Sequence, residues 1–233
     1  MSLSSKSYEW IVFDAVGTLI YPTPSVAETY QTIGKRFGSQ LPIDEIRRRF
    51  RQAFYNSEAA DCDQESGLIT SELIETQRWR RVVAEVLDDV NDSEACFEEL
   101  FTQFGLPTAW ACFDDVQPTL AALISAEKNI AIASNFDRRL NSVCDGNPPL
   151  DQVHVRVVSS LVGYRKPSPL FFSAMLNLLN TTADNVLIIG DDPTNDIQGP
   201  LAVGIDALQI DRASPGNDRV LNDLTDLIDR LSL

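Results

Sequence analysis

Five short apolar runs divide the chain, and patterns of helical periodicity separate the later ones. Four of the runs are rich in β-branched residues and nearly continuous, which is typical of strands buried on both faces of a parallel sheet. They are residues 10–13, 130–133, 155–158, 186–189 and 206–210, and the helical patterns lie at 118–128, 137–144, 169–179 and 195–203. This alternation predicts an α/β fold with a doubly wound parallel sheet of five strands.

The interval between the first two apolar runs is much longer than the others and reads mostly as helix. Apolar residues recur at helical spacing over residues 25–37, 43–55, 71–87 and 93–104, with Ser25 as a plausible N-cap of the first helix. Four consecutive amphipathic helices favour a small bundle. We therefore expect a helical cap domain at residues 22–108, inserted into a Rossmann-like core formed by residues 1–21 and 109–233.

Composition narrows the class of protein. The 233 residues are 44% hydrophobic and 23% charged, the balance of a soluble globular protein. The net charge of −15 argues against nucleic-acid binding, because phosphate backbones are bound mainly by clustered Lys and Arg. No apolar run approaches the roughly 20 residues of a membrane span, and the N-terminus lacks an apolar signal core. We expect a cytoplasmic protein that binds neither nucleic acid nor membrane.

The cysteines do not indicate a metal site. Cys62, Cys96, Cys112 and Cys144 form no C-x-x-C pair, and His154 is the one histidine of the chain. A structural zinc site needs four nitrogen or sulfur ligands, so buried, reduced thiols are the better interpretation.

Polar residues follow three of the predicted strands at the point where each strand ends. Asp14 follows the first, Ser134 and Asn135 follow the second, and Gly190, Asp191 and Asp192 follow the fourth. Open parallel sheets bind ligands beyond the carboxyl ends of their strands. Each motif alone also fits a turn or a helix cap, but together they indicate a site.

The acidic residues of this site indicate a cation. Asp191, Asp192 and Asp196 crowd one loop, and Asp14 joins them if the first and fourth strands are neighbours. Like charges a few ångströms apart are unfavourable unless a cation neutralises them, and hard oxygen ligands suit Mg²⁺. Lys166, in the segment GYRKP, supplies a fixed positive charge at the same sheet edge.

The motifs DAVGT, SN, RKP and GDDPTND, in this order and with an early helical insertion, resemble the haloacid dehalogenase (HAD) superfamily with a helical cap. The resemblance covers nearly the whole chain. It implies that Asp14 is the nucleophile that forms an aspartyl-phosphate and that Thr18 orients it. Ser134 and the backbone amide of Asn135 would bind the transferred phosphoryl group, and Lys166 would balance the charge of Asp14 and the phosphate.

The same resemblance implies a set of metal ligands. Asp14, the main-chain carbonyl of Val16 and Asp191 would bind Mg²⁺. Asp192 or Asp196 would lie close to the ion or would hydrogen-bond to its other ligands.

Val16 departs from the pattern of the superfamily's phosphatases, which carry there an Asp that protonates the leaving group. General acid or base catalysis is worth roughly 10² to 10⁴ in rate. We therefore expect a phosphatase that acts on a small phosphorylated metabolite and favours leaving groups of low pKa. The alternatives are a 2-haloacid dehalogenase, which needs no acid because halide leaves unprotonated, and a catalytically weak binding protein on this scaffold. The substrate and the oligomeric state, monomer or homodimer, are not determined by the pattern.

Overall fold

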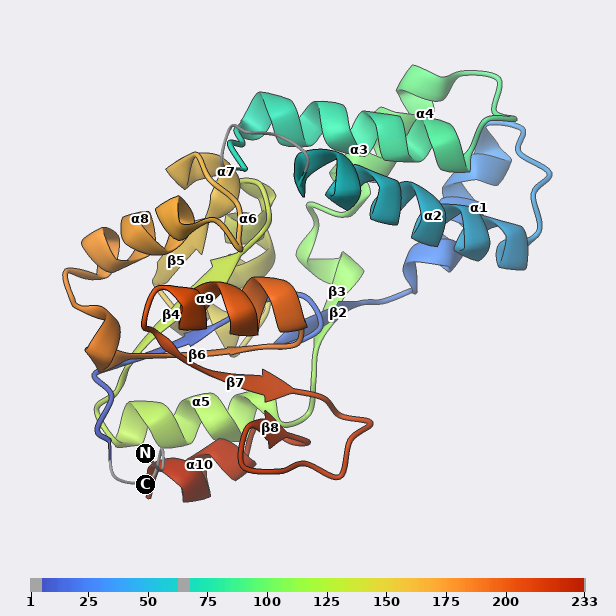
Figure 1. The fold of residues 1–233 in the computed structure, drawn as a ribbon. Helices are drawn as coiled ribbons and strands as arrows, with labels where there is room; N and C mark the ends of the chain where they lie inside the picture. The colour runs from blue at the N-terminus through green and yellow to red at the C-terminus, as the bar shows by residue number, and fades with distance from the viewer. Residues whose placement is uncertain (1–5, 63–67, 233) are drawn as a thin grey trace.

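A parallel sheet of six strands forms the core of the fold (Figure 1). The computed structural model describes residues 6–62 and 68–232. In spatial order the strands are β5 (Val155–Val158), β4 (Asn129–Ser134), β1 (Trp10–Phe13), β6 (Val186–Gly190), β7 (Asp206–Ile210) and β8 (Val220–Leu221). All five predicted strands are present. The sixth, β8, has two residues, too few to give a periodic signal.

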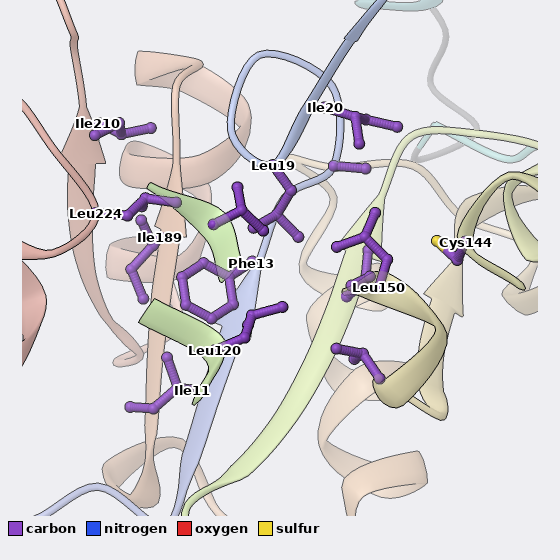
Figure 2. Packing of buried hydrophobic residues seen from close by; sticks show 14 of the residues in the cluster. Ile11, Phe13, Leu19, Ile20, Leu120, Cys144, Leu150, Ile189, Ile210 and Leu224 are labelled. Atoms are coloured by element: carbon purple, nitrogen blue, oxygen red, sulfur yellow. The ribbon is translucent and has the colours of Figure 1, made fainter. Parts of the chain in front are cut away.

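Apolar side chains alternate between the two faces of the sheet. Ile11 and Phe13 point into one hydrophobic cluster and Val12 into another, as the two-residue period of a strand requires. Figure 2 shows the first cluster, in which Phe13 lies close to Leu120 and Ile189. Both faces are buried, which explains why the strand sequences are nearly continuous in apolar residues.

Helices cover each face of the sheet (Figure 1). Residues of α5 (Val116–Ser125), α6 (Arg139–Asp145) and α10 (Asp226–Leu231) pack into the first cluster. On the other face lie α8 (Pro169–Leu179) and, beside it, α9 (Gly199–Ala202). The short helix α7 (Ser159–Val162) follows β5. This layered arrangement confirms the predicted α/β class.

Four further helices pack around a hydrophobic cluster of their own (Figure 1). They are α1 (Val26–Arg36), α2 (Ile43–Cys62), α3 (Glu72–Val86) and α4 (Ser93–Gln103), called here the helical bundle. Ser25 caps α1 and forms a capping box with Glu28. The helix α2 continues through Cys62, beyond the predicted end at residue 55. The domain boundaries 22 and 108 stay a prediction.

An antiparallel pair of short strands, β2 (Ile20–Pro22) and β3 (Trp110–Cys112), lies where the chain enters and leaves the helical bundle. The pair was not predicted, because its partners lie far apart in the sequence and each has three residues. Short 3-10 helices occupy Pro107–Ala109, Leu150–Gln152 and Ala183–Asn185. The helix predicted at 195–203 is a π-helix, Pro193–Gln198, followed by α9.

Two of the expected buried thiols, Cys96 and Cys144, are buried, and Cys112 is partly exposed. The Cys62 side chain lies outside the described part of the structure. Within residues 6–62 and 68–232, each helix is too short or too polar to span a lipid bilayer.

Candidate active site

The residues predicted at the strand ends meet at one edge of the sheet. β1 lies between β4 and β6, so Asp14 emerges between Ser134 at the end of β4 and Asp191 after β6. The Asp14 amide donates to the carbonyl of Ile189 at 2.8 Å, which extends the β1–β6 pairing past the last strand residue. The first and fourth predicted strands are therefore neighbours, as the convergence of these acids required.

The ammonium group of Lys166 makes three hydrogen bonds at this edge. It donates to Oδ1 of Asp14 at 2.7 Å, to Oδ1 of Asp196 at 2.6 Å and to the carbonyl of Ala133 at 2.8 Å. The side chain of Asn135 brackets the Lys166 backbone, accepting from its amide at 2.8 Å and donating to its carbonyl at 3.0 Å. Asn135, expected to contribute its backbone amide, thus also fixes Lys166 through its side chain.

Burial and charge act in opposite directions on Lys166. Burial alone would lower the pKa of its ammonium group, but the carboxylates of Asp14 and Asp196 raise that pKa above its ordinary value. Lys166 therefore carries a permanent positive charge next to the candidate nucleophile.

Three carboxylates, Asp14, Asp191 and Asp196, form a cluster in which each offers one oxygen atom and these three atoms lie within 4.8 Å of one another. Burial raises the pKa of all three, to about 6 for Asp196, and the charge of Asp196 raises the pKa of Asp191 further. One lysine faces these three acids. The uncompensated charge and the hard oxygen donors fit a small divalent cation, which would favour the ionised form of each carboxyl.

Two glycines allow the carboxylates to come this close. Gly17 has a φ of +91°, and a Cβ atom there would lie 2.3 Å from Oδ2 of Asp191. A Cβ atom on Gly190 would lie 2.3 Å from Cγ of Asp196. Any side chain at either position would displace an acid of the cluster, so the glycines of DAVGT and GDD shape the site.

Two predicted residues make contacts other than those expected. The hydroxyl of Thr18, expected to orient Asp14, donates to Oδ1 of Asp191 at 3.2 Å. Oδ1 of Asp192 accepts from the amides of Thr194 and Asn195, both at 2.8 Å, and so caps the π-helix. Asp192 lies outside the group of three carboxylates, and of the two acids considered for metal support Asp196 is the one that belongs to it.

A cleft of about 700 Å³ opens above this edge of the sheet. The cleft is lined by Asp14, Ser134, Lys166 and Asp191, together with Val16, a residue that is 36% exposed. The cleft gives a small molecule access to Asp14, and the residue next to the nucleophile is apolar.

The opposite wall of the cleft includes charged residues of the helical bundle. Oε1 of Glu58 on α2 accepts from Arg78 on α3 at 2.7 Å and from Arg165 at 2.6 Å. Arg165 directly precedes Lys166 in GYRKP, which is the one sequence signal that pointed to it. Two other bundle arginines lie away from the cleft: Arg47 pairs with Asp44 and Arg80 with Glu94.

Arg212, a residue that sequence reasoning missed, contacts the backbone of the loop that follows Asp14. Its guanidinium donates to the carbonyl of Thr18 at 3.0 Å and to Oδ1 of Asp115 at 2.9 Å. Arg212 lies 194 residues from Thr18, and no local pattern reports such a contact.

Comparisons with known proteins find relatives of this chain in sequence and in fold. A family model described as haloacid dehalogenase-like hydrolase matches residues 8–204. A human protein, haloacid dehalogenase-like hydrolase domain-containing protein 3, is 28% identical over 208 residues, which cover 87% of this chain and 80% of the human protein.

Two solved structures share the fold. A defluorinating L-2-haloacid dehalogenase superposes with a TM-score of 0.78 at 18% identity, covering 99% of this chain and 98% of its own. A HAD phosphatase from Thermococcus onnurineus superposes with a TM-score of 0.66 at 21% identity, covering 97% of each chain.

Proposed function

This chain belongs to the haloacid dehalogenase-like hydrolase family, and from that premise we propose that it is a Mg²⁺-dependent phosphatase of small phosphorylated metabolites. The observation that carries the proposal is the contact of Lys166 with Asp14 beside a cluster of three carboxylates. The curated relative and both solved structures carry hydrolase names, but they include a phosphatase and a dehalogenase. The choice between these activities therefore rests on the site.

The proposed reaction has two displacements at phosphorus. A carboxylate oxygen of Asp14 attacks the phosphorus atom, the bond to the leaving oxygen breaks, and that oxygen departs with the electron pair. Water then attacks the aspartyl-phosphate, releasing inorganic phosphate and restoring Asp14. Lys166, fixed 2.7 Å from Asp14, offsets the negative charge of the nucleophile and the phosphoryl group. Ser134 and the amide of Asn135 line the cleft where they can bind phosphoryl oxygens.

The acidic cluster supports the choice of a phosphatase. Asp14, Asp191 and the main-chain carbonyl of Val16 would hold Mg²⁺, with Asp196 beside them. The ion would supply positive charge that lets two anions, the carboxylate and the phosphate, approach each other. Two of these three acids, Asp14 and Asp196, are buried, and a cation would help to keep all three ionised.

Val16 restricts the range of substrates. Its side chain lines the cleft but has no proton to give to a departing alkoxide. Leaving groups that are stable as anions, such as carboxylates and phenolates, need no such proton. We therefore propose high activity on acyl or aryl phosphates and low activity on sugar phosphates.

A 2-haloacid dehalogenase is the second candidate, favoured by the apolar Val16 and by the dehalogenase structures that share the fold. The acidic cluster opposes it, because a substrate carboxylate would be repelled by Asp14, Asp191 and Asp196. We further propose that the helical bundle acts as the cap, that the protein is cytoplasmic, and that it works as a monomer or homodimer.

The test compares acetyl phosphate with glucose 6-phosphate, with Mg²⁺ or with EDTA. We expect Mg²⁺-dependent turnover of acetyl phosphate at least 100-fold above that of the sugar phosphate, and its loss in Asp14→Asn. Equal rates on both substrates, or activity that survives Asp14→Asn, would contradict the proposal. Halide release from an L-2-haloacid in EDTA would establish the dehalogenase instead. Absence of any phosphoenzyme under all of these conditions, with phosphatase activity created by Val16→Asp, would favour a catalytically weak binding protein.

A further inference from the structure

A second cavity adjoins the catalytic cleft on the side of the helical bundle. Its volume is about 240 Å³. Five residues line both spaces, namely Val16, Phe50, Phe54, Trp79 and Asn135. Val16 therefore stands at the junction, with the nucleophile Asp14 on one side and the second cavity on the other.

The wall of this second cavity is almost entirely carbon. It adds the side chains of Tyr30, Val83, Phe101 and Phe104, among others, to the shared aromatic residues. Ring pairs such as Tyr30 and Phe50, with centroids 5.4 Å apart and edge-to-face geometry, line it. Aromatic rings prefer such offset or edge contacts with further rings, so the wall suits a flat aromatic guest.

Three polar side chains of the wall, those of Arg139, Trp110 and Asn135, already have partners within the protein. The guanidinium of Arg139 donates to both carboxylate oxygens of Asp137, at 2.8 and 2.7 Å, and to the carbonyl of Phe101 at 2.6 Å. The indole nitrogen of Trp110 donates to the carbonyl of Phe104 at 3.1 Å. The Asn135 amide is bound to the Lys166 backbone. A ligand in this cavity would therefore be selected for apolar surface.

The size of the cavity sets the size of its occupant. An apolar cavity of about 150 Å³ is enough to bind benzene. The 240 Å³ found here therefore accommodates one aromatic ring with small substituents or a fused pair of rings.

Two independent observations thus meet at Val16. The residue provides no proton for the leaving group, and it borders an aromatic-lined space that begins next to the nucleophile. A phenol is a suitable leaving group on both grounds, because it ionises near pH 10, as the tyrosine side chain does, and its ring is apolar. We propose that the substrates are aryl phosphates, whose phosphoryl group lies at Asp14 and whose ring occupies the second cavity. This assignment rests on the proposed phosphatase function.

The chemical step balances without an acid at residue 16. A carboxylate oxygen of Asp14 forms a bond to phosphorus while the bond from phosphorus to the phenolic oxygen breaks. The phenolate leaves with the electron pair and takes a proton from water after it departs. The cavity contributes affinity for the ring and excludes water from it.

A binding experiment tests the cavity separately from turnover. The full chain with Mg²⁺ is titrated calorimetrically with 2-naphthylmethylphosphonate and with methylphosphonate, two non-hydrolysable anions that differ in the rings alone. We expect the naphthyl compound to bind at least tenfold more tightly. Val26→Phe, which adds a ring to the wall at the first turn of α1, should remove this preference. Val90→Phe, at a partly buried position between α3 and α4 that lines neither space, should preserve it.

A kinetic experiment uses 2-naphthyl phosphate and acetyl phosphate as substrates. We expect kcat/KM for 2-naphthyl phosphate relative to acetyl phosphate to fall at least tenfold in Val26→Phe and to stay unchanged in Val90→Phe. Equal affinity for the two phosphonates, or a ratio insensitive to Val26→Phe, overturns the aryl assignment while acetyl phosphate turnover preserves the phosphatase. Absence of turnover on every phosphate overturns the proposed function, and the aryl phosphate assignment with it.

Discussion

The ammonium group of Lys166 lies 2.7 Å from Oδ1 of Asp14, although 152 residues separate the two in the sequence. The same group lies 2.6 Å from Asp196, so one buried cation joins the loops that follow β1 and β6. This contact links the charge balance of the site to the stability of the fold.

Removing the charge of Lys166 should lower both the stability of the fold and the activity of the site. In Lys166→Met, Asp14 and Asp196 would face each other without a cation, and loss of one partner of a buried ion pair typically lowers the free energy of unfolding by about 3 to 5 kcal/mol. Urea denaturation should show this loss, and acetyl phosphate turnover should fall at least 100-fold. Lys35→Met, an exposed position on α1, is the control and should change neither. Unchanged stability of Lys166→Met would contradict this prediction, because it would mean that Lys166 is not needed to balance the charge of Asp14 and Asp196.

Asp191 should be required for the effect of Mg²⁺ on stability. An ion that binds the folded state alone raises the melting temperature, and more so as its concentration rises. We expect thermal denaturation to show this rise in the wild type and not in Asp191→Asn. The neighbouring variant Asp192→Asn is the control, because asparagine caps helices as well as aspartate does and Asp192 lies outside the cluster. An equal loss in both variants would contradict the assignment of Asp191.

Replacing Gly17 by alanine should be unfavourable for two reasons, its left-handed backbone and its close approach to Asp191, and a second glycine separates them. In Gly17→Ala a Cβ would lie 2.3 Å from Asp191 at a φ of +91°, whereas Gly204 has a similar φ of +83° with nothing within 4 Å. The left-handed backbone alone costs about 1 to 2 kcal/mol for a residue with a Cβ. Gly204→Ala should therefore lose about that much stability and keep its activity. Gly17→Ala should lose more and should also lose the stabilisation by Mg²⁺. Equal behaviour of the two variants would argue against the close approach.

Val16→Asp should extend the substrate range. The new carboxyl would lie in the cleft beside Asp14, where it can protonate a departing alkoxide. We expect glucose 6-phosphate turnover to rise by roughly 10² and acetyl phosphate turnover to change little. Val16→Asn, of similar size and without a transferable proton, is the control. An equal gain in both variants would attribute the effect to polarity.

Stability should depend on pH through Asp206, far from the cleft. Oδ2 of Asp206 accepts from Lys6 at 2.7 Å and from the hydroxyl of Tyr8 at 2.9 Å. Burial opposes these bonds, but together with the charge of Lys6 they hold the pKa of Asp206 below its ordinary value. The stabilisation is therefore complete above the unfolded pKa of about 3.9 and is lost as pH falls through the folded value.

The variant Asp206→Asn tests this dependence. It should lower the free energy of unfolding by about 1 to 2 kcal/mol at pH 7 and by less at pH 3, as measured by urea denaturation. A difference of the same size at both pH values would contradict the assignment to the ionised carboxylate.

The sequence by itself determined the class of fold and the composition of the site. The apolar runs specified five strands because a strand buried on both faces must be apolar at every position, and the two-residue β8 carried no such signal. Asp14, Ser134 and Asp191 could be predicted to converge because the carboxyl ends of parallel strands share one edge. The sequence also showed that residue 16 is not an acid, because this depends on residue type alone.

The tertiary structure decided which of these residues touch. Asp192 and Asp196 are the same residue type in the same motif. In the structure, however, Asp192 accepts from the amides of the π-helix, whereas Asp196 accepts from Lys166. Arg212 and Glu58 reach the site from distant segments, and no local pattern encodes such contacts. The aromatic cavity beside Val16 likewise combines residues of the helical bundle and the core. Helical periodicity marks those aromatics as buried, but whether they enclose a space or fill it depends on how the helices pack.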